Sequence, residues 1–221
     1  MKRVLRENGL SLAMFGLFFI FLIGQALTGY REKNSDLQQH HQTQLTFGEY
    51  LTSGHFVEAV FENWESEFLQ MGAYVLLTTF LFQKGSPESK KLDAAEPTDE
   101  EPNSANPPAN APWPVHRGGL FLTIYKHSLT AALFLLFFIS FLLHAAGGAR
   151  EYSADQVEHG EQSVTMLQFM GTSEFWFQSF QNWQSEFLSV GVLIVLSIFL
   201  RQKGSPESKP VDHPHGETGE E

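Results

Sequence analysis

The chain repeats itself with an offset of 119 residues, and this repeat limits the folds open to it more than any other feature. Residues 10–90 align with residues 129–209 without a gap, and 34 of the 81 aligned positions are identical. Identity is highest in the sequences NWxSEFL and QKGSPESK, each of which occurs once in either copy. Because an internal repeat sets the architecture before local patterns do, we expect one structural unit to occur twice.

Each copy contains two apolar segments, which we interpret as membrane-spanning helices. Residues 10–27 and 129–146 are runs of 18 residues without a charge, which is long enough to cross the hydrocarbon core of a bilayer. Residues 68–82 and 187–200 are shorter apolar runs, and they need their polar N-terminal flanks to reach that length. We therefore predict spans at about 10–30, 63–83, 128–148 and 182–202.

Two spans return the chain to its starting side of the membrane, so both copies have the same orientation. The predicted fold is an all-α integral membrane protein with four transmembrane helices, arranged as two parallel helical hairpins about a pseudo-two-fold axis along the membrane normal. Repeat unit 1 covers residues 1–90 and repeat unit 2 covers residues 118–209. Residues 91–117 and 210–221 are rich in proline and acidic residues, and they are predicted to be a disordered linker and a disordered tail.

The basic residues near the ends of the spans predict the orientation in the membrane. Of the 14 lysines and arginines, only Arg31, Lys33 and Arg150 fall on one side. We therefore expect both termini and the linker to be cytoplasmic. The residues on the cytoplasmic side are Lys2, Arg3, Arg6, Lys84, Lys90, Lys91, Arg117, Lys126, Arg201, Lys203 and Lys209.

The loop between the two spans of each copy carries a capping-box sequence. The sequences are TFGE at Thr46 and TMLQ at Thr165, and each predicts a short helix. A longer helix is expected to begin near Phe56 and near Phe175, because apolar residues recur from there at helical spacing. That helix is amphipathic at first and then spans the membrane.

Two further features of this helix have structural interpretations. Trp64 and Trp183 are expected to anchor it in the membrane interface, with the indole N–H groups in water. In QKGSPESK, a basic residue followed by Gly85 or Gly204 and then by proline is typical of a helix C-terminus. We interpret this sequence as a helix stop.

A polar stripe beside the tryptophans is the candidate functional site. Carboxylates at the outer edge of the membrane are costly unless they are paired, hydrated or protonated, so Glu67 and Glu186 are candidates for an ion or proton site. The alternative is that the stripe only caps loops and satisfies the backbone near water. The candidate residues are Glu67, Glu186, Asn63, Asn182, Ser66, Ser185, Gln25 and His144.

Two arrangements of this stripe are open. In the first, the two stripes face each other, so that Glu67 and Glu186 share a proton or a cation and His144 is the nearby counter-charge. In the second, each stripe turns into its own hairpin, where Glu67 meets Gln25 and Glu186 meets His144. We predict the first arrangement, in which the two carboxylates share one site, and the second is the competing arrangement.

Other residue types exclude several kinds of chemistry. Glu58, Glu62 and Glu65 follow one helix face in the first copy only, and we interpret them as a solvated surface. The histidines do not have the spacing of a zinc motif, so neither a metal nor a cofactor is predicted. There is no cysteine, which excludes thiolate chemistry. A net charge of −11 argues against nucleic acid as a partner.

The passages that carry NWxSEFL and QKGSPESK resemble a family of uncharacterised bacterial membrane proteins, classed as a domain of unknown function. The resemblance covers nearly all of the chain except the linker and the tail. It implies a multi-pass protein of the bacterial inner membrane with this duplicated layout, and it implies no activity.

Three classes of function are compared on these grounds. We expect a non-catalytic membrane protein that acts through contacts with the lipid bilayer, with further copies of itself or with other membrane proteins. The alternative is a small channel, or a proton- or cation-coupled transporter, that uses the paired carboxylates. An enzyme is the third class, and it would need a nucleophile–base pair or a metal set that the sequence does not display.

Overall fold

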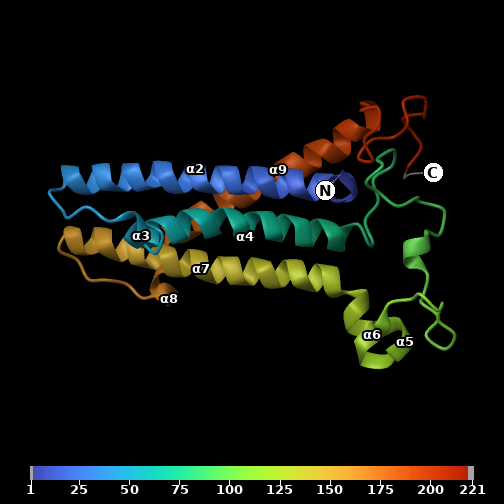
Figure 1. Cartoon of the computed structure of the whole chain (residues 1–221), viewed down its shortest axis with the longest axis horizontal. Coiled ribbons are helices and arrows are strands. Elements are labelled where there is room, and N and C mark those ends of the chain that lie inside the picture. Colours follow the sequence, from blue (N-terminus) through green and yellow to red (C-terminus); the bar gives the residue numbers. More distant parts are fainter. Residues whose placement is uncertain (1, 219–221) are drawn as a thin grey trace. The chain divides into compact units, whose positions relative to one another are not determined.

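The computed structural model describes residues 2–218, and these residues form helices, turns and loops without a strand. Helices α2, α4, α7 and α9 are the long ones, and the remaining helices are short (Figure 1). The prediction of an all-α chain is therefore confirmed. The elements are α1 (Lys2–Glu7), α2 (Gly9–Gln39), α3 (Phe47–Tyr50), α4 (Gly54–Leu77), a 3-10 turn (Pro97–Asp99), α5 (Trp113–Arg117), α6 (Gly119–Lys126), α7 (Ser128–Glu158), α8 (Met166–Phe169) and α9 (Ser173–Phe199).

Three of the long helices are long and apolar enough to cross a membrane, namely α2, α7 and α9. Helix α4 does not meet the same requirement, because its most C-terminal stretch of 18 residues still holds Glu62, Glu65 and Glu67. Composition and length thus support a membrane protein with three candidate spans.

By contacts within the chain, the protein divides into two units. One unit holds Met1–Phe61 and Leu142–Phe175, and the other holds Glu62–Phe141 and Trp176–Glu221. Helices α4, α7 and α9 each continue from one unit into the other. These units group residues by contact, so the division of the sequence into repeat units stays a prediction.

In the first unit, the loops before α4 and α9 fold as the capping boxes predict. The hydroxyl oxygen of Thr46 accepts a hydrogen bond from the backbone N–H of Glu49, and Thr165 does the same for Gln168. The side chains of Glu49 and Gln168 accept the backbone N–H of their threonines in return, at 2.7 and 2.8 Å. This reciprocal pattern satisfies two N–H groups at each helix start, so the predicted short helices are confirmed as α3 and α8.

The capping box of α3 is expected to weaken in acid. Its hydrogen bonds from the backbone and hydroxyl of Thr46 hold the pKa of Glu49 below its ordinary value of 4.5. A carboxylate with a lowered pKa stabilises the folded state above its unfolded pKa, and this contribution is lost as the pH falls through the folded pKa. Amide hydrogen exchange in α3, corrected for the intrinsic rate, should therefore accelerate below about pH 4.5.

Helix α8 is the internal control for this measurement, because Gln168 stands where α3 has Glu49 and does not titrate. Exchange in α8 should show no step in the same pH range. The variant Glu49→Gln should remove the step from α3 as well. An acid-induced step that persists in this variant would assign it to another group.

The two short helices contribute buried aromatic residues to the core of the first unit. Tyr50 and Phe169 end α3 and α8, and both are buried. The ring of Tyr50 lies 5.4 Å from that of Phe56, and the ring of Phe169 lies 5.6 Å from that of Phe175. Positions 119 residues apart therefore make equivalent aromatic pairs, and each pair joins a loop helix to the start of the following long helix.

Glycines allow α4 and α7 to approach closely in this unit. A Cβ atom at Gly147 would lie 2.5 Å from the backbone nitrogen of Glu58, and one at Gly54 would lie 2.8 Å from the carbonyl oxygen of Gly147. A Cβ atom at Gly148 would meet the Phe169 ring at 2.4 Å. Side chains larger than hydrogen cannot fit at these positions, so the helix crossing depends on glycine.

In the second unit, QKGSPESK folds into the same compact turn in both copies. The Oγ of Ser89 accepts the backbone N–H of Gln83 at 2.8 Å, and Ser208 accepts that of Gln202 at 2.9 Å. Gly85 and Gly204 both have a φ of +88°, which L-residues rarely adopt. Equal hydrogen bonds and equal dihedral angles show that this sequence codes for one local structure.

The interpretation of QKGSPESK as a helix stop is wrong in its details. Helix α4 ends at Leu77 and α9 ends at Phe199, so Gly85 and Gly204 lie well beyond the helix ends. The chain between Leu77 and Gln83 turns without helical structure before the motif begins. The positive φ of the two glycines therefore belongs to the serine-bonded turn and not to a helix C-cap.

Candidate functional site

The two candidate carboxylates, Glu67 on α4 and Glu186 on α9, both belong to the second unit. They lie close enough for their charges to interact. Glu67 is exposed and Glu186 is half-buried. Like charges that interact repel each other, and a bound proton or cation would relieve that repulsion. That the two groups form one site stays a prediction.

A third carboxylate, on another face of α4, was missed by sequence reasoning. Glu65 is fully buried, and its Oε1 accepts a hydrogen bond from the indole Nε1–H of Trp183 at 3.1 Å. The interpretation of Glu65 as part of a solvated face is therefore wrong. The same contact corrects the expectation for Trp183, because its N–H group is bonded to a buried carboxylate and not to water.

Aromatic rings surround Trp183 and explain why it holds this position. Its ring packs edge-on against Phe180 at 5.6 Å, Phe137 at 6.2 Å and Trp176 at 6.3 Å. Edge-to-face pairs of this kind fix the orientation of an indole ring, and here the N–H group is held toward Glu65. A buried carboxylate with an oriented donor is a preorganised polar site.

The face of α4 that carries Glu65 contained a signal for this burial. At helical spacing, Glu65 is followed on that face by Leu69 and Gly72. Gly72 is buried, and a Cβ atom added there would lie 3.4 Å from the Cβ of Leu133 and 3.5 Å from the ring of Phe134 on α7. A helix face that is apolar from Leu69 onward packs against another helix. Glu65 lies on the same face one turn earlier, so the pattern could have predicted that it is buried.

The serines and asparagines of the stripe differ between the two copies. Ser66 is buried and Ser185 is exposed, although each hydroxyl donates to the carbonyl three residues earlier, that of Asn63 or of Asn182. Asn63 is exposed, whereas Asn182 is half-buried and donates to the Gln178 carbonyl at 3.2 Å. The two copies therefore differ residue by residue, because Ser66 is the more enclosed of the two serines and Asn182 is the more enclosed of the two asparagines.

A buried amide on α4 adds to this polar interior. Gln70 is 5% exposed, and its Nε2 atom is one of two buried side-chain atoms without a hydrogen-bond partner among residues 2–218. The other such atom is the hydroxyl oxygen of Ser179 on α9. Buried polar groups without a partner are costly, so each of these two atoms calls for an explanation.

The two remaining candidates, Gln25 and His144, belong to the first unit. Gln25 donates from Nε2 to the carbonyl oxygen of Ala59 at 3.3 Å. His144 is fully buried, and its ring stacks on that of Phe175 at 4.9 Å with 29° between the planes. Both side chains thus help to join α2 or α7 to the following long helix within the first unit. Their pairing with Glu67 or Glu186 stays a prediction.

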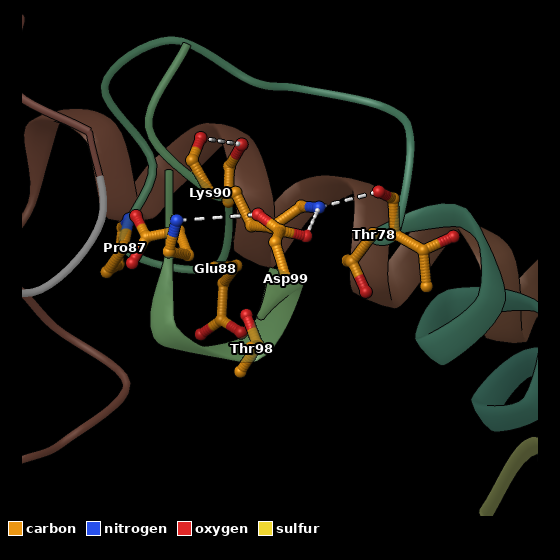
Figure 2. Close-up of a pocket in the computed structure, with 9 residues that line it drawn as sticks. Thr78, Pro87, Glu88, Lys90, Thr98 and Asp99 are labelled. Atoms are coloured by element: carbon orange, nitrogen blue, oxygen red, sulfur yellow. Dashed lines mark hydrogen bonds and ion pairs between the residues drawn. The ribbon is translucent and has the colours of Figure 1, made fainter. Parts of the chain in front are cut away.

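The second polar region lies at the turn after α4, and Figure 2 shows it in close-up. A pocket of about 490 Å³ opens there, lined by Thr78 and Thr79 directly after α4, by the QKGSPESK turn and by the following segment. Lys90 projects across it and donates to the carbonyl oxygen of Thr79 and to Asp99, both at 2.7 Å (Figure 2). This contact holds the pKa of Asp99 below its usual value.

These contacts involve the segment for which disorder is predicted. Residues 91–117 include the 3-10 turn Pro97–Asp99, and Asp99 is tied to Lys90 as described above. In the second copy, Lys209 donates from Nζ to the carbonyl oxygens of Pro214, His215 and Glu217, each at 3.0 Å. Both lysines of the motif therefore hold the chain that follows them. The predicted disorder of the linker and tail stays a prediction.

Metal-ligating side chains do not gather in the described part of the chain. Among residues 2–218, no group of three or more histidines, aspartates and glutamates is placed to hold a metal ion.

Comparisons with known proteins connect the chain to one family. A family model described as "Domain of unknown function (DUF6766)" matches residues 1–220. No curated protein matches the chain, and no solved structure matches it.

Proposed function

The chain belongs to the DUF6766 family, a domain of unknown function, and we propose that it is a non-catalytic multi-pass protein of the bacterial inner membrane. It acts through contacts with lipid, with further copies of itself or with other membrane proteins. Its function would then be to bind these partners, and it would catalyse no reaction.

The observation that carries this proposal is the apolar surface of the long helices. Only 6% of the most apolar stretch of α2, and 6% of that of α9, is buried within the molecule. Along α2, the side chains of Phe15, Ile20 and Phe21 are between 63% and 68% exposed. A surface this apolar requires hydrocarbon or another protein to cover it.

In the proposal, α4 is the fourth span. It aligns with α9 residue by residue at the 119 offset, and α9 is apolar enough to cross. The glutamates that set α4 apart lie in its N-terminal part, so they would stand near the outer edge of the membrane, where one of them is bonded to Trp183. The repeat then forms two parallel hairpins with both termini in the cytoplasm.

Cysteine labelling tests this topology directly, because the chain has no native cysteine. Single variants Ser35→Cys and Ser104→Cys would be treated in intact cells with a reagent that does not cross the inner membrane. We expect labelling at position 35 and protection at position 104 until the cells are opened. Labelling at position 104 in intact cells would refute the proposed topology.

A second candidate function is favoured by one observation, the fully buried carboxylate of Glu65 on α4. Together with Glu67 and Glu186 on the predicted spans, it points to a protein that binds and moves protons or cations. Intramembrane carboxylates are typical of such paths. Four short spans leave little room for a gated path within one chain, so this function would require an oligomer.

Flux measurements separate the two functions. The purified protein in liposomes is expected to produce no proton or cation flux above that of protein-free liposomes if it acts through contacts alone. Flux that disappears in the double variant Glu67→Gln and Glu186→Gln would establish the second function. The variant Glu207→Gln, in the motif turn of the second copy, is the control for a carboxylate outside the site.

A further inference from the structure

The end of α4 carries an apolar pocket that the proposed function does not explain. Its volume is about 250 Å³, and its wall is mostly apolar. Leu77, Leu81 and Phe82 form one side, and Ile194 of α9 contributes to it within the same unit. Leu81 and Phe82 are themselves about half exposed, so the pocket opens among apolar side chains at the molecular surface.

This apolar pocket adjoins the polar pocket of Figure 2. The two share Thr78, Glu88 and Ser89 in their walls. Glu88 stands at the junction, where its Oε2 accepts the hydroxyl of Tyr74 at 2.7 Å. A ligand that fills both pockets would have an apolar part beside Leu77 and a polar part beside Glu88.

The charged residues of the polar pocket determine which charge the polar part of the ligand must carry. Its wall holds Glu88, Glu96 and Asp99 against one basic residue, Lys90. Lys90 is already paired with Asp99 at 2.7 Å, so the carboxylates of Glu88 and Glu96 determine the remaining charge. An ammonium group complements two carboxylates and can donate a hydrogen bond to each.

Lys90 can serve a second group of the same ligand. An ammonium group has three N–H donors, and the Thr79 carbonyl and Asp99 accept two of them. One donor remains for an oxygen of a phosphate that stands beside the ligand's amine. The pocket thus offers acceptors for a cation and a donor for an anion a short distance apart.

We propose that the two pockets bind a phospholipid whose headgroup carries a primary amine, with an acyl chain in the apolar pocket and the amine between Glu88 and Glu96. This inference rests on the proposed function, because a lipid reaches the site only if α4 ends at a membrane surface. It goes further by naming the lipid and the side chains that select it. The lipid is chosen over a soluble amine because the apolar pocket would otherwise stay unfilled.

Lipid binding by the whole chain in detergent tests the inference. The protein would be mixed with equal amounts of phosphatidylethanolamine and phosphatidylglycerol with the same acyl chains, and the retained lipid would be counted by native mass spectrometry. We expect a preference for phosphatidylethanolamine of about tenfold, the effect of roughly one charge-assisted hydrogen bond. Equal retention of the two lipids would overturn the inference.

Variants connect this preference to the pocket. The double variant Glu88→Gln and Glu96→Gln keeps hydrogen-bond acceptors, among them one for Tyr74, and removes the charge. It should lose the preference, whereas Glu207→Gln at the equivalent position of the second copy should retain it. A preference that survives the double variant would contradict the assignment.

A third variant tests the apolar part. Leu77→Trp should fill the apolar pocket and lower retention of phosphatidylethanolamine, while Leu196→Trp, at the equivalent position of α9, should not. Phosphoethanolamine has the same headgroup without acyl chains, and it should fail to compete. Effective competition by this soluble compound would refute a lipid site.

These measurements do not depend on the topology experiment, because they use protein in detergent. If labelling refutes the proposed topology while the lipid preference and its loss in Glu88→Gln and Glu96→Gln persist, the pocket assignment survives and the proposed function fails. If the labelling succeeds and the preference is absent, the inference fails alone.

Discussion

Replacing Gly147 by alanine is expected to lower the free energy of unfolding by about 2 kcal/mol, although alanine favours helices more than glycine does by about 1 kcal/mol. The added Cβ atom would stand 2.5 Å from the backbone nitrogen of Glu58 and 3.0 Å from its Cα. Both atoms belong to the backbone of α4, so no side chain can rotate out of the way. The helices would have to separate to make room for the methyl group.

Gly24→Ala is the matched control for this variant. Gly24 also lies inside a long helix, α2, but a Cβ atom there would meet nothing within 4 Å. The helix preference should act alone at this position and leave stability equal or higher by up to about 1 kcal/mol. Unfolding of both variants by sodium dodecyl sulfate in mixed micelles gives the comparison. Equal stability of the two variants would show that α4 and α7 do not cross as described.

The second large effect is expected at the hydrogen bond between Trp183 and Glu65. Trp183→Phe retains an aromatic ring and removes the N–H group, which leaves the buried Oε1 of Glu65 without that donor. A hydrogen bond to a charged group contributes roughly 1.5 to 3 kcal/mol, so we expect a loss of about 2 kcal/mol. Glu65→Gln, which retains a side-chain oxygen as acceptor, should cost less than Trp183→Phe.

A double-mutant cycle assigns this loss to the pair. Glu65→Met removes the carboxylate with little change of volume, and in its presence Trp183→Phe should cost about 1.5 kcal/mol less than in the native chain. Trp113→Phe is the control for losing an indole N–H, because Trp113 is 61% exposed. A coupling energy near zero would mean that the hydrogen bond does not contribute to stability.

Local structure was predictable wherever neighbouring residues make the deciding contacts. Thr46 with Glu49 and Thr165 with Gln168 form the capping boxes that their spacing predicts, since all partners lie within one helical turn. The helices that follow begin at Gly54 and Ser173, within two residues of the expected starts at Phe56 and Phe175. The all-α character followed from the same kind of pattern.

The candidate site was predictable only in part. The pattern identified Glu67 and Glu186 as exceptional, because a charge at the head of an apolar run is costly without a partner. It misjudged Glu65, because the absence of an acidic residue at the aligned position 184 was read as absence of a structural role. Burial of Glu65 depends on Trp183, which is distant in sequence and reaches it only when α4 and α9 are packed together.

By itself, the sequence determined the helical class, the apolar segments, the equivalence of positions 119 residues apart and the local turns that both copies share. Periodicity reports which residues lie on one face of a helix, and a repeat reports which residues have the same neighbours in the chain. Neither reports which face meets which other helix. The tertiary structure alone decided that Glu65 is buried against Trp183, that the backbone of α4 packs closely against Gly147, and that Glu88 lines two adjoining pockets. These contacts bring together residues that are far apart along the chain or lie on separate elements, so the sequence pattern could not show them.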